Sequence, residues 1–323
     1  MRATTAEARH RNRVAARVRR GNSPIVVTPA RLRTWPLPQP SRGGSKDDRG
    51  RVLVVGGAPG MPGAVILAAN AALRAGAGKL QIATCASIAQ LVAVTVPEAR
   101  VFSLPEGKSG GIARSAASEL VARAREVQAV LIGPGMVDRR AVFRLMDALI
   151  PKLAGRKGPT VVIDAEPLSW VGAHRRALSA LGGRVVLTPH AGEMASMLDL
   201  SKSRVLAEAE AIARRVAGEL SAVVALKDAV TLIAAPDGRV FRNDAGNVGL
   251  ATSGSGDTLS GVVAGLAARG AEPLQAAVFG VHLHARAGEV LARRLGPIGY
   301  LARELLDEIP KRMAALARPS RRR

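Results

Sequence analysis

Short apolar runs alternate with longer mixed segments along most of this chain. From residue 51 onward, runs of three or four residues rich in Val, Ile and Leu recur, and each is followed by a stretch long enough for a helix. Continuous apolar runs of this kind are typical of parallel strands that helices cover on both faces. We predict central strands at Val52–Val55, Leu80–Ala83, Val130–Ile132, Thr160–Ile163, Val185–Leu187 and Val223–Leu226. The pattern predicts an α/β fold with a mostly parallel central sheet.

The pattern changes after the sixth predicted strand. Thr231–Ala234 and Arg239–Phe241 flank Pro236-Asp237-Gly238, which favours a tight hairpin and an antiparallel sheet edge. Helices are expected at Ala64–Ala75 and Ala113–Arg125. From Gly256 the chain is expected to be helical to its end, with breaks near Gly270 and at Gly296-Pro297.

Charge is concentrated at the two ends of the chain. Of the net +22, residues 1–51 contribute +10, residues 301–323 contribute +4 and the long middle contributes +8. We therefore expect a disordered basic extension at 1–26, one domain at 27–317 and a basic tail at 318–323. The extension resembles a transit peptide in charge but lacks an apolar helical face, so we favour disorder over targeting.

Composition excludes several classes of protein. No apolar run approaches the ~20 residues of a membrane-spanning helix. The single cysteine, Cys85, excludes an internal disulfide and a cysteine-based metal cluster, and we expect a cytoplasmic protein. Basic charge alone suggests nucleic-acid binding, but no recognised motif or aromatic-interleaved basic stripe accompanies it, so we expect no specific nucleic acid and no membrane partner.

The segments that follow the predicted strands are the candidates for chemistry, because ligands of open parallel sheets bind at the carboxyl ends of strands. The glycine-rich stretch 56–63 has neither Walker A nor dinucleotide-fold spacing, and a strand-to-helix turn that needs small residues is the favoured explanation. Gly133-Pro134-Gly135 and Asp164-Ala165 also follow predicted strands, but each alone is weak evidence for a ligand site. His190 and Glu193 stand three apart beyond a strand, where they act in catalysis or simply begin a helix.

The stretch 249–261 is the most informative. Its small residues Gly254-Ser255-Gly256-Asp257 open an apolar helix, so that successive backbone N–H groups converge at a helix N-terminus. Such a turn forms an anion hole for a phosphate. A carboxylate beside an anion is electrostatically costly, which suggests that Asp257 takes a proton from a substrate hydroxyl. An N-capping aspartate is the alternative. Lys227, just past the sixth strand, can reach a nucleotide phosphate as a point charge.

Together these segments resemble the ribokinase-like superfamily, and within it the ADP-dependent (S)-NAD(P)H-hydrate dehydratase family. The resemblance runs from about Thr28 to Pro310. Its matching elements are Ser45-Lys46, Pro62-Gly63-Ala64, Gly76-Ala77-Gly78, Gly133-Pro134-Gly135, Asp164-Ala165, Thr188-Pro189-His190, Gly192-Glu193, Leu226-Lys227 and Gly254-Ser255-Gly256-Asp257. The resemblance implies a ribokinase-like three-layer sandwich.

The resemblance also assigns roles to residues. It implies that the hydrated nicotinamide nucleotide contacts Ala64, Gly135, His190 and Asp257. It implies that ADP contacts Lys227, Asp228, Ala229, Val230, Thr231 and Gly256. Asp257 matches the catalytic base, and Glu193 is a candidate to hold magnesium through water. Two positions depart from the family pattern: Ala191 stands where proline is usual, and Asp228 where glycine is usual, so a carboxylate lies near the ADP phosphates.

The activity implied is repair of NADHX and NADPHX, the hydrates of NADH and NADPH, to the dihydropyridine at the expense of ADP, which gives AMP and phosphate. The resemblance implies Mg²⁺, an NAD(P)HX epimerase as functional partner and a homotetramer. It leaves open NADHX against NADPHX, and ADP against ATP. The alternative is a small-molecule kinase of the same superfamily, of the hydroxyethylthiazole or hydroxymethylpyrimidine kinase type, with the same anion hole and aspartate.

Overall fold

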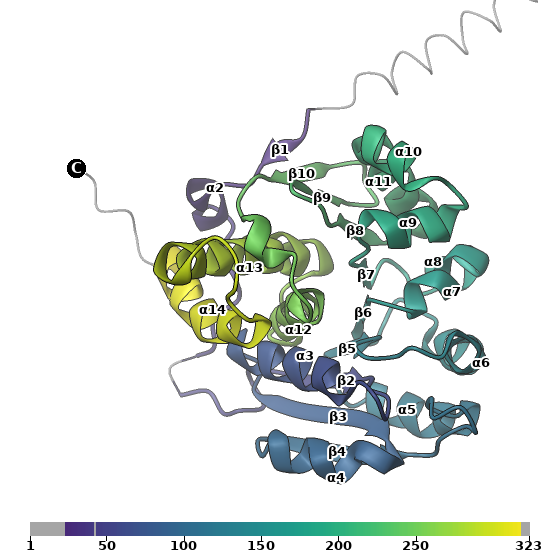
Figure 1. Ribbon diagram of the computed structural model, residues 1–323. Coiled ribbons are helices and arrows are strands. Elements are labelled where there is room, and N and C mark those ends of the chain that lie inside the picture. Colours follow the sequence, from purple (N-terminus) through teal and green to yellow (C-terminus); the bar gives the residue numbers. More distant parts are fainter. Residues whose placement is uncertain (1–22, 42, 318–323) are drawn as a thin grey trace, which may run out of the picture.

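The computed structural model describes residues 23–41 and 43–317, which form a ten-stranded sheet in the order β1-β10-β9-β8-β7-β6-β5-β2-β3-β4 (Figure 1). The strands are β1 (Ile25–Val26), β2 (Arg51–Val55), β3 (Lys79–Cys85), β4 (Ala99–Leu104), β5 (Ala129–Ile132), β6 (Thr160–Ile163), β7 (Val185–Leu187), β8 (Val223–Leu226), β9 (Thr231–Ala234) and β10 (Val240–Asn243). All neighbours from β8 to β4 pair in parallel, whereas β9 is antiparallel to both β8 and β10. The predicted α/β fold with a mostly parallel sheet is confirmed.

Helices lie on both faces of this sheet (Figure 1). The α-helices are α2 (Pro29–Arg33), α3 (Pro62–Arg74), α4 (Ala86–Thr95), α5 (Ala117–Ala124), α6 (Arg139–Leu149), α7 (Pro167–Ala173), α8 (Arg175–Ser179), α9 (Ala191–Leu198), α10 (Lys202–Ala207), α11 (Ala209–Leu220), α12 (Ser255–Ala268), α13 (Pro273–Leu295) and α14 (Ala302–Ala317). Short 3₁₀ helices span Arg114–Ala116, Ile150–Leu153 and Val248–Leu250. One layer contains α3, α12, α13 and α14, and the other contains α5 to α9 and α11.

The central strands are apolar because both of their faces are buried. Every residue of β5, β7 and β8 is buried, as are the last four residues of β2. The edge strand β4 is instead only partly buried, with Arg100 and Ser103 exposed. This difference follows from position, since a strand covered on two faces has no polar side.

Two helices beside the sheet approach unusually closely. A methyl group added to Gly261 of α12 would lie 2.2 Å from the Ala68 carbonyl oxygen of α3, and one added to Gly265 would lie 2.3 Å from that of Ala72. Any larger residue would therefore push the helices apart. Gly261 approaches Ala68, and Gly265, four residues later, approaches Ala72, so α3 and α12 run parallel. Their N-termini lie together at the carboxyl edge of the sheet.

Three details differ from the sequence-based expectation. Ile25 and Val26 pair with β10, so the ordered domain begins before residue 27 and the hairpin is not the outermost edge. The N–H of Val27 adds a further bond to the Arg242 carbonyl at 2.8 Å. A two-residue strand has no periodicity that a sequence pattern can reveal. The edge strand β4 was also missed, since polar residues interrupt its apolar run.

The rest of the expected basic extension, residues 1–22, and the tail at 318–323 lie outside the described residues. Within the described part, none of the helices combines the length and the apolar character needed to span a membrane.

Candidate active site at the carboxyl edge of the sheet

The five predicted loops meet at one edge of the sheet. They follow β2, β5, β6, β7 and β8, which are consecutive neighbours, and the parallel arrangement places all of their carboxyl ends together. Close contacts tie the loops to one another. The N–H of Gly57 donates to Pro134 O at 2.7 Å, and that of Lys227 donates to Pro189 O at 2.8 Å. The N-terminus of α12 joins them from the helical layer, so the edge carries all the candidate segments.

The turn that opens α12 leaves backbone amides available to an anion. Gly254 is the N-cap at φ +84°, a conformation that other residues rarely adopt. Within the described residues, the amides of Gly254, Gly256 and Asp257 donate to no backbone carbonyl. The amide of Ser255, which we expected among these donors, instead donates to Thr252 O at 3.2 Å because the chain turns tightly there. The remaining amides and the helix dipole favour a bound anion.

Asp257 lies in a partly buried and strongly charged environment. Burial raises the pKa of its carboxyl from 3.8 to about 6, and the Asp164 and Glu193 carboxylates add to the increase, while Lys227 opposes it. A carboxyl with this pKa is mostly ionised at neutral pH and remains basic enough to accept a proton. Asp257 is not the N-cap of α12. The N-cap is Gly254, and no side chain makes a capping hydrogen bond there.

Lys227 occupies the centre of the charged cluster. Its Nζ lies 3.0 Å from Asp164 Oδ1 and 3.9 Å from Glu193 Oε2. Asp164 is buried, and its Oδ1 also accepts a bond from Thr188 Oγ1 at 2.8 Å. Burial alone would lower the pKa of Lys227, but the carboxylates of Asp164 and Glu193 outweigh it and raise that pKa. Lys227 therefore stays charged and links the segments that follow β6, β7 and β8.

His190 and Glu193 form a capping box at the start of α9. The His190 Nδ1 accepts from the amides of Gly192 and Glu193, and Glu193 Oε2 accepts from the His190 amide at 2.7 Å. The pair therefore begins a helix, which was the structural alternative to a catalytic role, and this capping box fixes Nδ1 as an acceptor. Nε2 lies 3.7 Å from Glu193 Oε1, and the His190 side chain is 58% exposed, so it can still contact a ligand.

A large cavity at this edge has a volume of about 790 Å³. Its lining includes His190, Lys227, Asp228, Ala229, Thr231, Asn243, Ala245, Gly246, Asn247, Val248, Leu250, Ala251, Thr252, Ser255, Gly256, Leu259, Val281, His284 and Ala285. The lining contains five of the six residues expected around ADP: Lys227, Asp228, Ala229, Thr231 and Gly256. Val230 is not part of it. Apolar walls with a few convergent polar groups are typical of a nucleotide-sized ligand site.

Ala64 and Gly135 lie together but outside that lining. A methyl group added to Gly135, which has φ +74°, would lie 3.2 Å from Ala64 Cβ and 2.7 Å from Met61 O. A groove of about 240 Å³ lies on the other side of His190, lined also by Arg139, Ala165, Glu166, Ser169, Gly192, Glu193 and Ser196. His190 thus borders both spaces.

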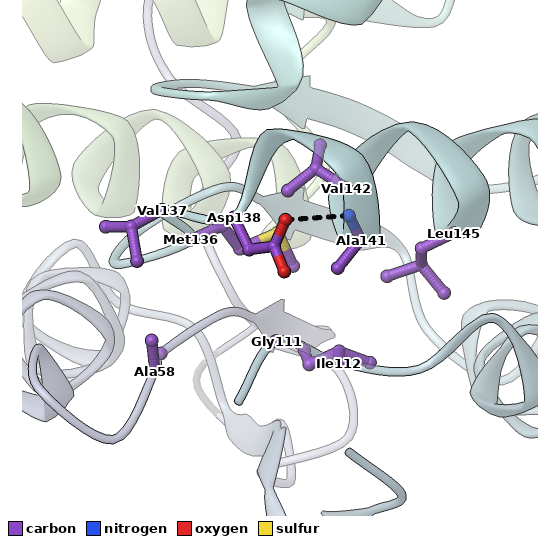
Figure 2. A pocket seen from close by; sticks show the side chains of 10 residues that line it. Ala58, Gly111, Ile112, Met136, Val137, Asp138, Ala141, Val142 and Leu145 are labelled. Carbon is purple, nitrogen blue, oxygen red and sulfur yellow. Dashed lines mark hydrogen bonds between the residues drawn. The ribbon is translucent and has the colours of Figure 1, made fainter. Parts of the chain in front are cut away.

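A further pocket near Met136 is too small for a ligand. Figure 2 shows it between Ala58, the Gly111-Ile112 segment and the start of α6, lined mostly by apolar side chains. Its volume is about 10 Å³, roughly the space of one water. The one carboxylate there, Asp138, accepts a bond from the Ala141 amide at 3.0 Å and caps α6. This pocket is part of the packing.

The side chains present suit a magnesium ion that a polyphosphate carries. Among residues 23–41 and 43–317, no group of three or more His, Cys, Asp or Glu side chains forms a complete metal site. Magnesium bound to phosphates keeps several waters and needs only one or two carboxylates from the protein. Glu193 keeps Oε1 free of its capping bond, and burial raises its pKa, so an approaching cation would favour its ionised form.

Sequence reasoning missed several polar residues of the large cavity, among them Asn243, Asn247 and His284. His284 of α13 is buried in the cavity wall, and its Nε2 lies 3.1 Å from Ser255 Oγ in the anion loop. It lies mid-helix among apolar residues, where no motif marks it. The only signal was its repetition with His282, two positions earlier, on a helix expected to be buried.

Comparisons with known proteins agree with this arrangement. A family model described as NAD(P)H-hydrate dehydratase matches residues 52–311. The ADP-dependent (S)-NAD(P)H-hydrate dehydratase of Xanthomonas campestris is 46% identical over 285 residues, which cover 88% of this chain and 94% of that protein. The bifunctional NAD(P)H-hydrate repair enzyme of Moorella thermoacetica is 41% identical, over 85% of this chain and 51% of its own, so this chain spans about half of it.

A solved structure shares the fold over nearly its whole length. The ADP/ATP-dependent NAD(P)H-hydrate dehydratase from Bacillus subtilis, co-crystallized with ATP and Mg²⁺, superposes with a TM-score of 0.74 at 28% identity, covering 91% of this chain and 99% of that one. The expected ribokinase-like fold is confirmed by the solved structures that this chain resembles.

Proposed function

Because the chain belongs to the NAD(P)H-hydrate dehydratase family, we propose that it dehydrates (S)-NADHX and (S)-NADPHX to NADH and NADPH. ADP is the co-substrate and is converted to AMP and phosphate. The observation that carries the proposal is the pairing of Asp257, whose pKa is raised to about 6, with free backbone amides at the start of α12. A proton acceptor and an anion site thus lie within one helical turn, beside a cavity of nucleotide size.

ADP occupies the large cavity in this proposal. Its phosphates extend toward the amides of Gly254 and Gly256, which donate to no backbone carbonyl, and its nucleoside lies among the apolar residues of α13 and the 245–252 segment. The hydrated ring lies on the other side of Asp257, toward Ala64, Gly135 and His190. The groove beyond His190 has space for the part of the dinucleotide that is remote from the ring.

Asp257 begins the reaction by accepting the proton of the ring hydroxyl. The hydroxyl oxygen forms a bond to the β-phosphorus of ADP, and the bond from that phosphorus to the bridging oxygen breaks, which releases AMP. The carbon–oxygen bond of the ring then breaks, and phosphate leaves with the oxygen. The ring nitrogen's lone pair assists this departure, and loss of a proton from the neighbouring carbon restores the dihydropyridine.

Magnesium, when bound with the nucleotide, neutralises polyphosphate charge. Glu193 would hold it through a metal-bound water, and Lys227 stays paired with Asp164 as a fixed positive charge nearby. Asp228 lines the same cavity and adds a carboxylate on the nucleotide side. The family premise further suggests a separate epimerase that supplies the S form, a homotetramer and a cytoplasmic site of action.

The decisive experiment supplies hydrated NADH, ADP and Mg²⁺ and follows the absorbance of the dihydropyridine. The proposal predicts recovery of that absorbance with one AMP and one inorganic phosphate per NADH. A kinase of the same superfamily would instead leave a stable phosphorylated substrate without inorganic phosphate. Accumulation of such a product would overturn the proposed function.

A further inference from the structure

The anion loop contains a hydroxyl whose role the proposed reaction does not yet assign. Ser255 lies in the first turn of α12, but its amide is engaged with Thr252 O. Its side chain is therefore its only remaining donor toward the cavity. Ser255 is buried, at 4% exposure, and yet it lines the 790 Å³ cavity beside Gly256.

The hydroxyl has one polar neighbour of fixed position. His284 Nε2 lies 3.1 Å from Ser255 Oγ, and the imidazole is itself buried in the cavity wall, at 7% exposure. Burial lowers the pKa of His284 to about 4 and the nearby charge of Lys227 adds to this, while a hydrogen bond to the Ser255 backbone partly opposes it, so the ring is neutral at physiological pH. A neutral imidazole carries one N–H, and a hydroxyl carries one O–H.

Two arrangements of these hydrogens are possible. If Ser255 donates to His284, the hydroxyl has no hydrogen left for a ligand. If His284 Nε2–H donates to Ser255 Oγ, the hydroxyl hydrogen is free to point into the cavity. A polyphosphate only accepts hydrogen bonds, so its presence selects the second arrangement.

We propose that His284 is a positioning residue that donates to Ser255 Oγ and thereby directs the Ser255 hydroxyl hydrogen onto the terminal phosphate of the bound nucleoside diphosphate. This inference rests on the proposed function for the identity of the ligand. It adds a side-chain donor to an anion site otherwise made of backbone amides. Ser255 is the residue that touches the phosphate, and His284 acts through it.

The inference is tested by nucleotide binding to the full chain. Dissociation constants for ADP and for AMP are measured by calorimetry for the wild type, S255A, H284L and the double variant. AMP lacks the terminal phosphate, so it reports whether the cavity remains folded. We expect S255A and H284L each to weaken ADP binding about tenfold, as loss of one hydrogen bond to a charged group does, with AMP affinity unchanged. The double variant should be no more than about twofold weaker than either single variant, since both remove the same interaction.

Two further variants separate positioning from packing. H284Q keeps an N–H donor near the position of Nε2 and should restore ADP affinity to within about threefold of the wild type. H282L is the matched control, because His282 is equally buried on α13 but bonds to Asn243 Oδ1 at 3.2 Å, and it should leave the ratio of ADP to AMP affinity unchanged.

Additive losses in the double variant, equal losses for ADP and AMP, or an H284Q as weak as H284L would overturn the inference. The wild type could still repair hydrated NADH in each of these cases. Such results would therefore count only against the proposed role of His284 and Ser255, and not against the proposed function. A wild type that binds neither ADP nor AMP would overturn the inference together with the proposed function.

Discussion

The environment that makes Asp257 a base should also make the wild-type protein less stable than an Asp257→Asn variant. Between pH about 4 and about 6, the unfolded chain has ionised this carboxyl while the folded protein still holds its proton. The folded state therefore binds more protons in that window, and the free energy of unfolding falls as pH rises through it. The amide side chain of the variant has no such proton to lose, so the variant escapes this loss.

The size of the effect follows from the pKa change. A rise from 3.8 to about 6 is about two pKa units. One unit corresponds to about 1.4 kcal/mol, so ionised Asp257 lowers the free energy of unfolding by about 3 kcal/mol at pH 8. The variant should be more stable than the wild type by about this amount at pH 8 and of equal stability at pH 4. Gains of this kind are common when a functional residue is removed.

The assay is urea unfolding of both proteins at pH 8 and pH 4, and the quantity compared is the difference in free energy of unfolding between them. Asp228→Asn is the matched control, because it removes an exposed carboxylate from the same site and should change stability little at either pH. A variant that is no more stable at pH 8, or one with the same gain at pH 4, would refute the argument that burial and neighbouring carboxylates hold Asp257 in a costly ionised state.

Three other predictions concern the charged cluster. The proposed reaction needs ionised Asp257, so kcat/KM should rise with pH and level off above about 6, and a flat profile from pH 5 to 8 would contradict this. Lys227→Met removes a charge that lowers the pKa of Asp257, so the rise of kcat/KM with pH should move to higher pH. The same variant leaves the buried Asp164 carboxylate without its cation, which should lower the free energy of unfolding in urea by about 3 kcal/mol. A rise that moves to lower pH would show that Lys227 does not act on Asp257. Asp228→Gly removes a carboxylate from the cavity wall, so ADP should bind more tightly, most clearly at low salt. Weaker ADP binding in calorimetry would show instead that Asp228 contributes to nucleotide recognition.

Much of this architecture could be predicted from local pattern. Strands such as β5 and β7 are wholly buried, so their apolar runs stand out in the sequence. The edge strand β4 mixes buried and exposed residues without a regular alternation, and β1 has only two residues, so neither produces a comparable signal. The site loops could be placed because parallel strands carry their carboxyl ends to one edge.

The contacts within the site could not be predicted in the same way. Lys227 was expected to reach a phosphate directly, but its nearest partner is the Asp164 carboxylate, which lies 63 positions away in the sequence. The Ser255 amide was expected in the anion hole, but a turn bond to Thr252 engages it. His284 approaches the site from the middle of a helix. These features depend on how separate elements pack, which no spacing of residue types encodes.

The central claim is that Asp257 accepts the hydroxyl proton while the turn beside it holds the phosphate that is transferred. It is tested most directly by comparing wild type and Asp257→Asn in the ADP-driven recovery of NADH from its hydrate, with ADP affinity measured on the same samples. The account predicts a rate that falls by about 100-fold or more, as loss of a general base does, with ADP binding retained. Near-normal turnover by the variant would contradict it.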